Sequence, residues 1–158
     1  MKRPIFALFT VALLTACGKS PEVPKAPELG VTDAVVRLAP VEGRPSSAYF
    51  TVHGGKATDR LVSVSSPKAA TIELHENKME SGMMSMQPLT GVDLPAGGEV
   101  AFKPGGNHAM LFGVDPAVKV GGTLPLHFTF QSGAAVDVEA KAISAGDEMP
   151  MSMEHEGH

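Results

Sequence analysis

The chain has 158 residues, with 13 basic and 17 acidic side chains, nine methionines and a single cysteine. This length accommodates one domain with tails rather than two domains. The formal net charge of −4, without a basic cluster, argues against a nucleic-acid partner, and one cysteine cannot form a disulfide within the chain.

Residues 1–16 are predicted to be a lipoprotein signal peptide. Lys2 and Arg3 precede an apolar run, residues 4–14, that is too short to span a bilayer as a stable helix. Residues 14–17 (Leu-Thr-Ala-Cys) resemble the lipobox of bacterial lipoproteins, in which the chain is cut before the cysteine and the cysteine carries the lipid, palmitate among its acyl chains. We therefore expect export to the periplasm and a membrane anchor at Cys17. An ordinary secretory signal with a chance cysteine is the alternative.

Residues 17–30 are predicted to be a linker between the lipidated cysteine and the domain. Pro21, Pro24 and Pro27 recur every third residue among polar neighbours, a pattern that favours extended polyproline II. At roughly 3.1 Å per residue, the linker holds the domain some 40 Å from the lipid.

Residues 31–143 are predicted to form one all-β domain. Leu124, Leu126, Phe128 and Phe130 alternate with other residue types, and the same two-residue period recurs along the segment. Such alternation is typical of strands with one face on a core and the other toward water. No segment shows a capped helical period. The pattern predicts an antiparallel sandwich or barrel, with strands near 31–38, 47–53, 60–65, 69–76, 83–88, 98–103, 108–113, 124–131 and 134–142.

Histidine and methionine gather at three of these strands. His108 and Met110 lie two apart in a strand and therefore project from the same face. His75 is expected to face outward at the end of its strand, and Met84 and Met86 share a face of the next one. Three strand ends can thus bring two imidazoles and one or two thioethers to one exposed rim.

Imidazole and thioether together form a soft, neutral ligand set. Thioethers are poor ligands for zinc, magnesium, calcium or manganese and favour Cu(I). Without a thiolate, the metal is held less tenaciously, which suits a protein that passes copper on. A blue-copper electron carrier needs a cysteine ligand, which residues 18–158 lack.

The spacing His75-x10-Met86-x21-His108-x-Met110 resembles that of the periplasmic copper chaperones of the PCuAC family. The resemblance covers essentially all of residues 31–143 and includes the segments Tyr49-Phe50-Thr51-Val52, Asp59-Arg60-Leu61-Val62, Glu73-Leu74-His75, Pro95-Ala96-Gly97-Gly98, Lys103-Pro104-Gly105-Gly106 and Leu126-His127-Phe128-Thr129-Phe130. It implies a cupredoxin-like, antiparallel Greek-key sandwich or barrel. It also implies one Cu(I) on these four ligands and delivery toward the copper A centre of cytochrome c oxidase.

Two departures from the family pattern concern possible donors. His53 stands where relatives tend to carry Asn, at a position that is not a family ligand. Residues 76–78 (Glu-Asn-Lys) stand where relatives often place further methionines, which leaves Met79, with Met84, as the accessory thioethers of this region.

Residues 144–158 lose the alternation and are predicted to be a mobile tail. The tail is rich in soft or borderline donors, and we expect it to hold a second, weaker copper, as Cu(I) or, through its histidines, as Cu(II). The candidate donors of the tail are Met149, Met151, Met153, His155 and His158.

The sequence therefore predicts a lipid-anchored, monomeric copper chaperone. Its expected partner is a copper A-bearing oxidase subunit or another periplasmic copper carrier. A copper-sequestering or resistance lipoprotein that delivers to no client needs the same ligands and stays open as the alternative, and an adhesion lipoprotein with incidental methionines would bind no metal selectively. No Ser-His-Asp order, phosphate-binding loop or H-E-x-x-H helix favours an enzyme.

Overall fold

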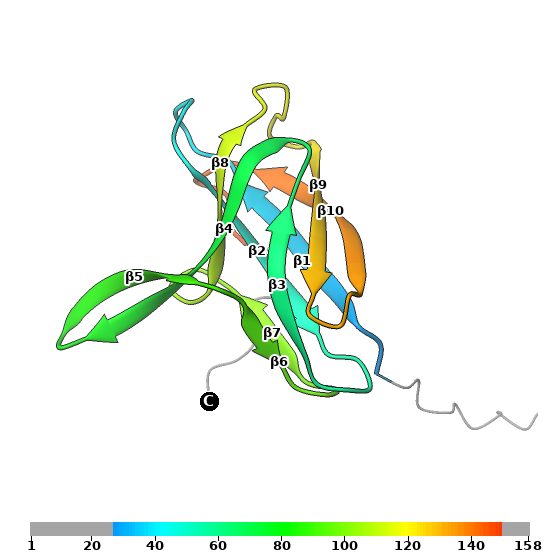
Figure 1. The fold of residues 1–158 in the computed structure, drawn as a ribbon. Coiled ribbons are helices and arrows are strands. Elements are labelled where there is room, and N and C mark those ends of the chain that lie inside the picture. The colour runs from blue at the N-terminus through cyan, green and yellow to red at the C-terminus, as the bar shows by residue number, and fades with distance from the viewer. Residues whose placement is uncertain (1–26, 150–158) are drawn as a thin grey trace, which may run out of the picture.

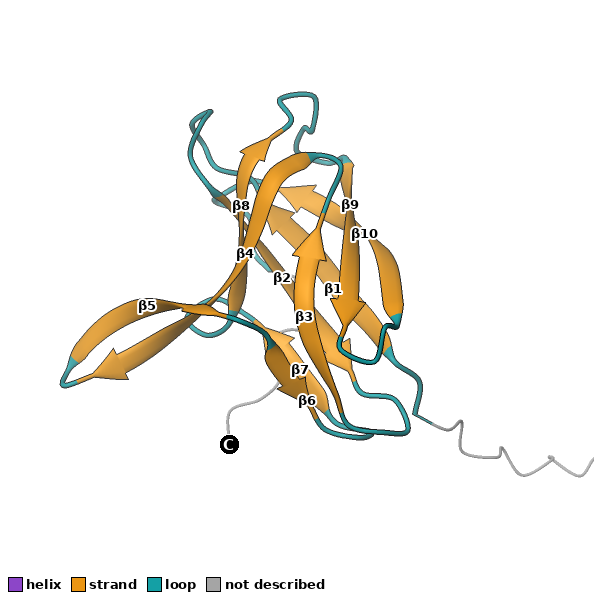
Figure 2. Ribbon diagram, viewed as in Figure 1, coloured by secondary structure: helices purple, strands orange, loops and turns teal. Residues whose placement is uncertain are grey.

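The computed structural model describes residues 27–149, and within that range every regular element is a β-strand (Figure 2). No helix that could cross a membrane occurs among these residues. The ten strands are β1 Gly30–Arg37, β2 Ser46–His53, β3 Asp59–Ser65, β4 Ala69–Glu80, β5 Met83–Leu89, β6 Val92–Leu94, β7 Glu99–Phe102, β8 His108–Val114, β9 Thr123–Phe130 and β10 Ala135–Ile143.

The two-residue period of the sequence is the period of burial in the strands. In β9, the side chains of Leu124, Leu126, Phe128 and Phe130 are buried and those between them are not. The all-β prediction is confirmed, and each of the nine predicted strands is present. The three-residue β6 was not predicted, and β4 continues to Glu80 instead of ending at residue 76.

The strands form one hydrogen-bonded sheet in the order β5-β4-β8-β2-β1-β10-β9-β3-β6, with β7 paired to β2. This sheet folds back on itself, so that β3, β9 and β10 form a layer that faces β2, β4 and β8 (Figure 1). The pairs are antiparallel, as predicted, except for β1 and β10, which run parallel with Val35 beside Lys141. That pair joins the first and last strands and leaves neither with a free edge.

The core lies between the two layers. Phe50 of β2 stacks on Phe102 of β7 with ring centroids 4.3 Å apart and meets the edge of Phe128 of β9 at 4.8 Å. All three rings are fully buried. Burial of a side chain of this size contributes about 1.5–3 kcal/mol, so this aromatic cluster is a main source of stability for the layers.

The hairpin of β4 and β5 extends beyond the body of the domain (Figure 1). Up to His75, β4 pairs with β8 on one side; from residue 76 it pairs with β5 alone. We call residues 76–87 the hairpin arm. Ser81 and Gly82 form its two-residue turn with φ of 51° and 82°. Positive φ at both positions is the type I′ geometry, whose twist matches the strands it joins.

The start of the predicted mobile tail is ordered against the domain. The Ser144 amide donates to the Asp147 carboxylate at 2.7 Å, and Arg37 donates to the Asp147 carbonyl oxygen at 3.1 Å. Met149 then packs on a small cluster of Val35, Tyr49 and Ile143. The remaining tail donors, the linker up to residue 26, the signal peptide and Cys17 lie outside the described residues.

Candidate metal centre

The register between β4 and β8 places the two candidate histidines directly opposite each other. His75 pairs with His108, and their rings lie nearly parallel, with centroids 5.9 Å apart. The site is more enclosed than the exposed rim expected from the sequence, because β4 continues past His75. The exposed fraction of His108 is 5%, and that of the His75 side chain is 12%.

A type II turn before β8 sets the tautomer of the neutral His108 ring. In residues 103–106, Pro104 and Gly105 occupy the central positions, Gly105 has a φ of 81°, and the Gly106 amide donates to the Lys103 carbonyl oxygen at 3.0 Å. The Gly106 carbonyl oxygen lies 3.0 Å from His108 Nδ1. Because a carbonyl oxygen only accepts, Nδ1 carries the proton in the neutral ring, and the lone pair is on Nε2.

Glu73 sets the opposite tautomer in His75. Its carboxylate Oε2 accepts a hydrogen bond from His75 Nε2 at 3.1 Å, which leaves the lone pair of the neutral ring on Nδ1. His75 Nδ1 is buried and has no hydrogen-bond partner among residues 27–149. A buried nitrogen without a partner costs about 1–3 kcal/mol. This orphaned lone pair is the feature of the site that most directly calls for a ligand.

Both motif methionines lie on the same face as the imidazoles. Met110 is two residues from His108 and pairs with Glu73, while its neighbours Ala109 and Leu111 point into the core. Met86 of β5 pairs with Asn77, two residues beyond His75 on β4. Paired residues project from the same side of a sheet, so two nitrogens and two thioethers share one face.

The accessory thioethers continue this face outward. Met79 pairs with Met84, with exposed fractions of 64% and 59%. Met84 therefore does not fill the core. Met149, expected to be a free donor on a mobile tail, instead lies half-buried against an apolar cluster, because its unbranched side chain covers the surface of Tyr49 and its neighbours.

The two other histidines between residues 27 and 149 pair with protein groups. His53 contacts Thr32 Oγ1 at 2.8 Å and the Glu99 carboxylate at 3.5 Å, and His127 contacts the Asp137 carboxylate at 2.6 Å. No three His, Cys, Asp or Glu side chains between residues 27 and 149 are arranged to hold a metal. On the face of His75 and His108, the further donors are thioethers.

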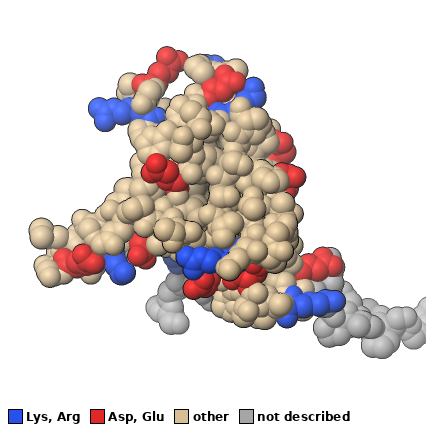
Figure 3. All heavy atoms as spheres, in the orientation of Figure 1, with Lys and Arg blue, Asp and Glu red and all other residues tan. Residues whose placement is uncertain are grey.

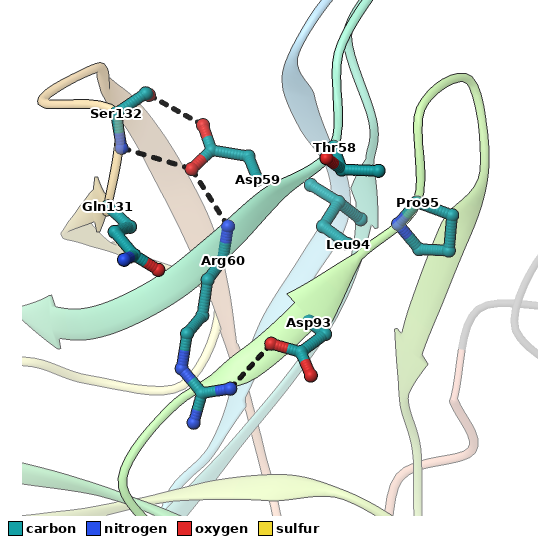
Figure 4. Close-up of a pocket in the computed structure, with 8 residues that line it drawn as sticks. All are labelled: Thr58, Asp59, Arg60, Asp93, Leu94, Pro95, Gln131 and Ser132. Atoms are coloured by element: carbon teal, nitrogen blue, oxygen red, sulfur yellow. Dashed lines mark hydrogen bonds and ion pairs between the residues drawn. The ribbon is translucent and has the colours of Figure 1, made fainter.

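A separate hollow of about 590 Å³ opens between β3, β6 and the turn after β9 (Figure 4). Its polar groups contact one another. Asp59 accepts from the Ser132 hydroxyl at 2.6 Å and from the Ser132 and Arg60 amides, and Arg60 pairs with Asp93. The Ser132 hydrogen bond holds the pKa of Asp59 below its usual value. These contacts join three segments of the sheet, and this hollow contains none of the candidate ligands.

The residue pattern predicts candidate donor atoms but not the groups that orient them. In the sequence, Glu73 and Gly106 belong to segments that resemble the PCuAC family, without a role of their own. The signal was present for Glu73, since a residue two positions from His75 in a strand shares its face. The role of Gly106 depends on turn geometry and was not readable from residue spacing.

The fold is similar to that of solved PCuAC domains. The apo PmoF2 PCuAC domain matches with a TM-score of 0.63 at 21% identity, over 78% of this chain and 98% of that one. The copper-bound PCuAC domain from PmoF2 matches with a TM-score of 0.59 at 22% identity, over 72% of this chain and 91% of that one. CuI-DR1885 from Deinococcus radiodurans matches with a TM-score of 0.59 at 23% identity, over 80% of this chain and 84% of that one. At these identities, the likeness establishes a cupredoxin-like fold alone.

The family is established by sequence. Residues 29–142 match the family described as "Putative lipoprotein LpqE-like", and the chain belongs to that family. A curated relative, "Putative lipoprotein Lxx21020" of Leifsonia xyli subsp. xyli (strain CTCB07), is 31% identical over 97 residues. These cover 60% of this chain and 58% of the relative, so the chain spans less than two thirds of the relative's length.

Proposed function

We propose that the protein is a copper chaperone that binds one Cu(I) through His75, Met86, His108 and Met110. The observation that carries the proposal is the pair of facing imidazoles. Each has its proton held by a protein acceptor and its lone pair free, and both share a face with two thioethers. The resemblance in ligand spacing and the copper-bound PCuAC domains of the same fold support the choice of metal.

Cu(I) suits this donor set for two reasons. Thioethers favour soft ions, and imidazole is an acceptable partner for copper. All four ligands are neutral, so a bound ion keeps a single positive charge, with a smaller desolvation burden than a dication would carry in this half-buried site. The Glu73 carboxylate, which pairs with Met110 across β4 and β8, adds charge compensation through His75 Nε2–H.

The unequal burial of the proposed ligands supports delivery by ligand exchange. His108 is nearly inaccessible, whereas Met86, on the edge strand β5, has an exposed fraction of 52%. In exchange, a partner's donor bonds to copper as the Met86–copper bond breaks, and the metal keeps its oxidation state. The proposed client is the copper A-bearing subunit of cytochrome c oxidase, or another extracytoplasmic copper carrier, on the strength of the family resemblance.

The proposed location is the periplasmic side of a membrane, held by a lipid on Cys17. The lipobox-like sequence supports this, as does membership of a family described as lipoproteins. Cys17→Ser is expected to abolish lipid labelling and processing, so that the protein fractionates with membranes only through its uncut leader. Recovery of a normally processed, lipid-labelled variant would overturn the anchor.

The test of the metal site is a Cu(I) titration against a chelator of known affinity, with X-ray absorption of the product. We expect one tightly held Cu(I) with both nitrogen and sulfur neighbours. A copper shell of nitrogen and oxygen alone would remove Met86 and Met110 from the site. Zinc is expected to compete poorly, because thioethers are weak zinc ligands.

Transfer separates a chaperone from a sequestering protein. The copper-loaded protein is mixed with the apo copper A domain of an oxidase subunit under reducing conditions. Metallation is followed by the Cu(I) content of that domain after the two proteins are separated. A chaperone metallates the domain faster than an equal amount of chelated Cu(I). Slower metallation than that control would favour copper storage instead.

A further inference from the structure

The hairpin arm exposes an unusual concentration of thioethers. Seven large apolar side chains between residues 27 and 149 are exposed, and four of them are methionines of this one hairpin: Met79 at 64%, Met83 at 72%, Met84 at 59% and Met86 at 52%. Methionine ordinarily fills gaps in cores. These side chains fill none, so packing within the domain does not explain them.

Three of the four methionines lie on one face of the arm. The register pairs Met79 with Met84 and Asn77 with Met86, whereas Met83 pairs with Glu80 on the reverse face. The reverse face is polar, and its groups contact one another: Gln87 donates to Glu80 at 3.3 Å, and Lys78 lies 3.4 Å from Glu76. The surface seen in Figure 3 agrees, with charge along one edge of the arm and uncharged atoms across the rest.

The geometry of the arm brings two sulfurs within reach of one ion. Directly opposed residues of an antiparallel pair have Cβ atoms about 4.5–5.5 Å apart. Methionine side chains are unbranched, with rotatable bonds that let the sulfurs of Met79 and Met84 converge. The adjacent type I′ turn at Ser81 and Gly82 fixes this register, so the pair is preorganised.

We propose that Met79 and Met84 form a second binding site for a soft monovalent cation, Cu(I) or its surrogate Ag(I), next to the candidate metal centre. Two thioethers open to water hold the ion more weakly than two imidazoles and two thioethers in an enclosed site. The binding part of this inference depends on the arm alone. Its use as an entry point for copper rests on the proposed function.

Met86 connects the two sites. It lies two residues from Met84 on the same face of β5, about 7 Å away along the strand, and it is also a proposed ligand of the inner centre. An ion on Met79 and Met84 moves inward when its bond to Met86 forms as a bond to Met84 breaks. No electron is transferred in this step, and no further reactant is needed.

The test is a titration of the full chain with Ag(I), followed by NMR of methionine methyl groups labelled with carbon-13. The chain carries Cys17→Ser so that no thiol competes, and each signal is assigned by a single Met→Leu substitution. We expect the Met86 and Met110 signals to shift with the first equivalent and the Met79 and Met84 signals to shift together with the next. Met83, on the reverse face, serves as the internal control and is expected to stay in place.

Matched variants complete the design. The double variant Met79→Leu/Met84→Leu keeps the apolar surface and loses both sulfurs, and it should lose the later Ag(I) step while Met86 and Met110 respond as before. Met83→Leu should change neither step. Signals of Met79 and Met84 that stay fixed while those of Met86 and Met110 shift would overturn the second site and leave the proposed function standing. Fixed Met86 and Met110 signals would contradict the proposed function instead.

Discussion

The body of the domain and the hairpin arm use their apolar side chains in opposite ways. In the body, Phe50, Phe102 and Phe128 are buried against one another, and their removal from water stabilises the fold. In the arm, methionines of the same two-residue period face solvent. Apolar side chains with the same two-residue period therefore stabilise the fold where a second layer of strands covers them. In the arm, where no described residue covers them, they remain accessible to a ligand.

The comparison also explains where the candidate centre lies. His75 and His108 stand at the position where β8 ends its pairing with β4 and the arm begins. The body supplies rigidity and excludes water from the imidazoles, while the arm supplies an accessible sulfur at Met86.

The largest effect is expected from a cavity in the body. Phe50→Ala removes a fully buried ring and should lower the free energy of unfolding by about 3–5 kcal/mol. Met84→Ala in the arm should change it by less than about 0.5 kcal/mol, as exposed substitutions usually do. Urea denaturation monitored by circular dichroism measures both. A loss of unfolding free energy above about 2 kcal/mol for Met84→Ala would mean that Met84 is packed against other groups. The contrast between a packed body and an exposed arm would then be wrong.

The next effect is on metal affinity at the boundary. Met110→Leu replaces a donor with a side chain of similar volume and should leave the unfolding free energy within about 1.5 kcal/mol of the parent. Cu(I) affinity should fall by more than about 100-fold, because even outer-sphere partners are worth about 10–100-fold. Competition with a Cu(I) chelator measures this, with Met83→Leu as the control. A variant that unfolds yet retains copper would place Met110 in the core instead.

A smaller effect is expected from the residue that orients His75. Glu73→Ala removes the acceptor of Nε2–H and should weaken Cu(I) binding by about 10-fold. Glu73→Gln retains an acceptor oxygen and should recover part of that loss. Nitrogen-15 NMR of the metal-free imidazole gives an independent readout: the Nδ1-protonated tautomer of His75 should rise in Glu73→Ala. Unchanged tautomer populations would show that Glu73 does not position the ring.

The smallest effect concerns acid stability at the far end of the sheet. The Ser132 hydroxyl lowers the pKa of Asp59 from its usual 3.8 in the folded chain. The stabilisation is therefore fully present above pH 3.8 and is lost as the pH falls through the folded-state pKa. Ser132→Ala should lower the unfolding free energy at pH 7 by at most about 1 kcal/mol, and solvent reduces this further. Urea titrations at pH 7 and pH 3 should show the difference shrinking in acid; a constant difference would contradict the linkage.

Strand positions were predictable because alternation and burial share one period. The sequence could not reveal β6, since three residues are too few to establish a period, nor the extension of β4, whose residues 77–80 are mostly polar. The parallel pairing of β1 with β10 was also beyond reach, because alternation fixes which face a residue occupies but not which strand lies beside it.

The sequence predicts the donors of the candidate site but not the groups that orient them. Histidine and methionine at a family spacing predict four ligands, and the register places two of these residues, His75 and His108, opposite each other. The choice of Nδ1 in one ring and Nε2 in the other depends on Glu73 and on the Gly106 carbonyl oxygen, which only the folded chain brings into place. Met149 shows what residue spacing does not predict. It alternates with Met151 and Met153 in the sequence, and nothing in that pattern indicates that it packs on Val35, Tyr49 and Ile143.

The Gly106 carbonyl oxygen accepts from two groups, His108 Nδ1 and, at 3.3 Å, the amide of Asn77 at the root of the arm. One oxygen thus ties the turn, the imidazole and the hairpin together. In evolutionary terms, the two segments should tolerate change very differently. The arm can lengthen or shorten by two residues in each of its strands, because a change of two keeps every side chain on its face of the sheet. A single insertion in residues 103–106 would displace the oxygen and release both the ring and the hairpin at once.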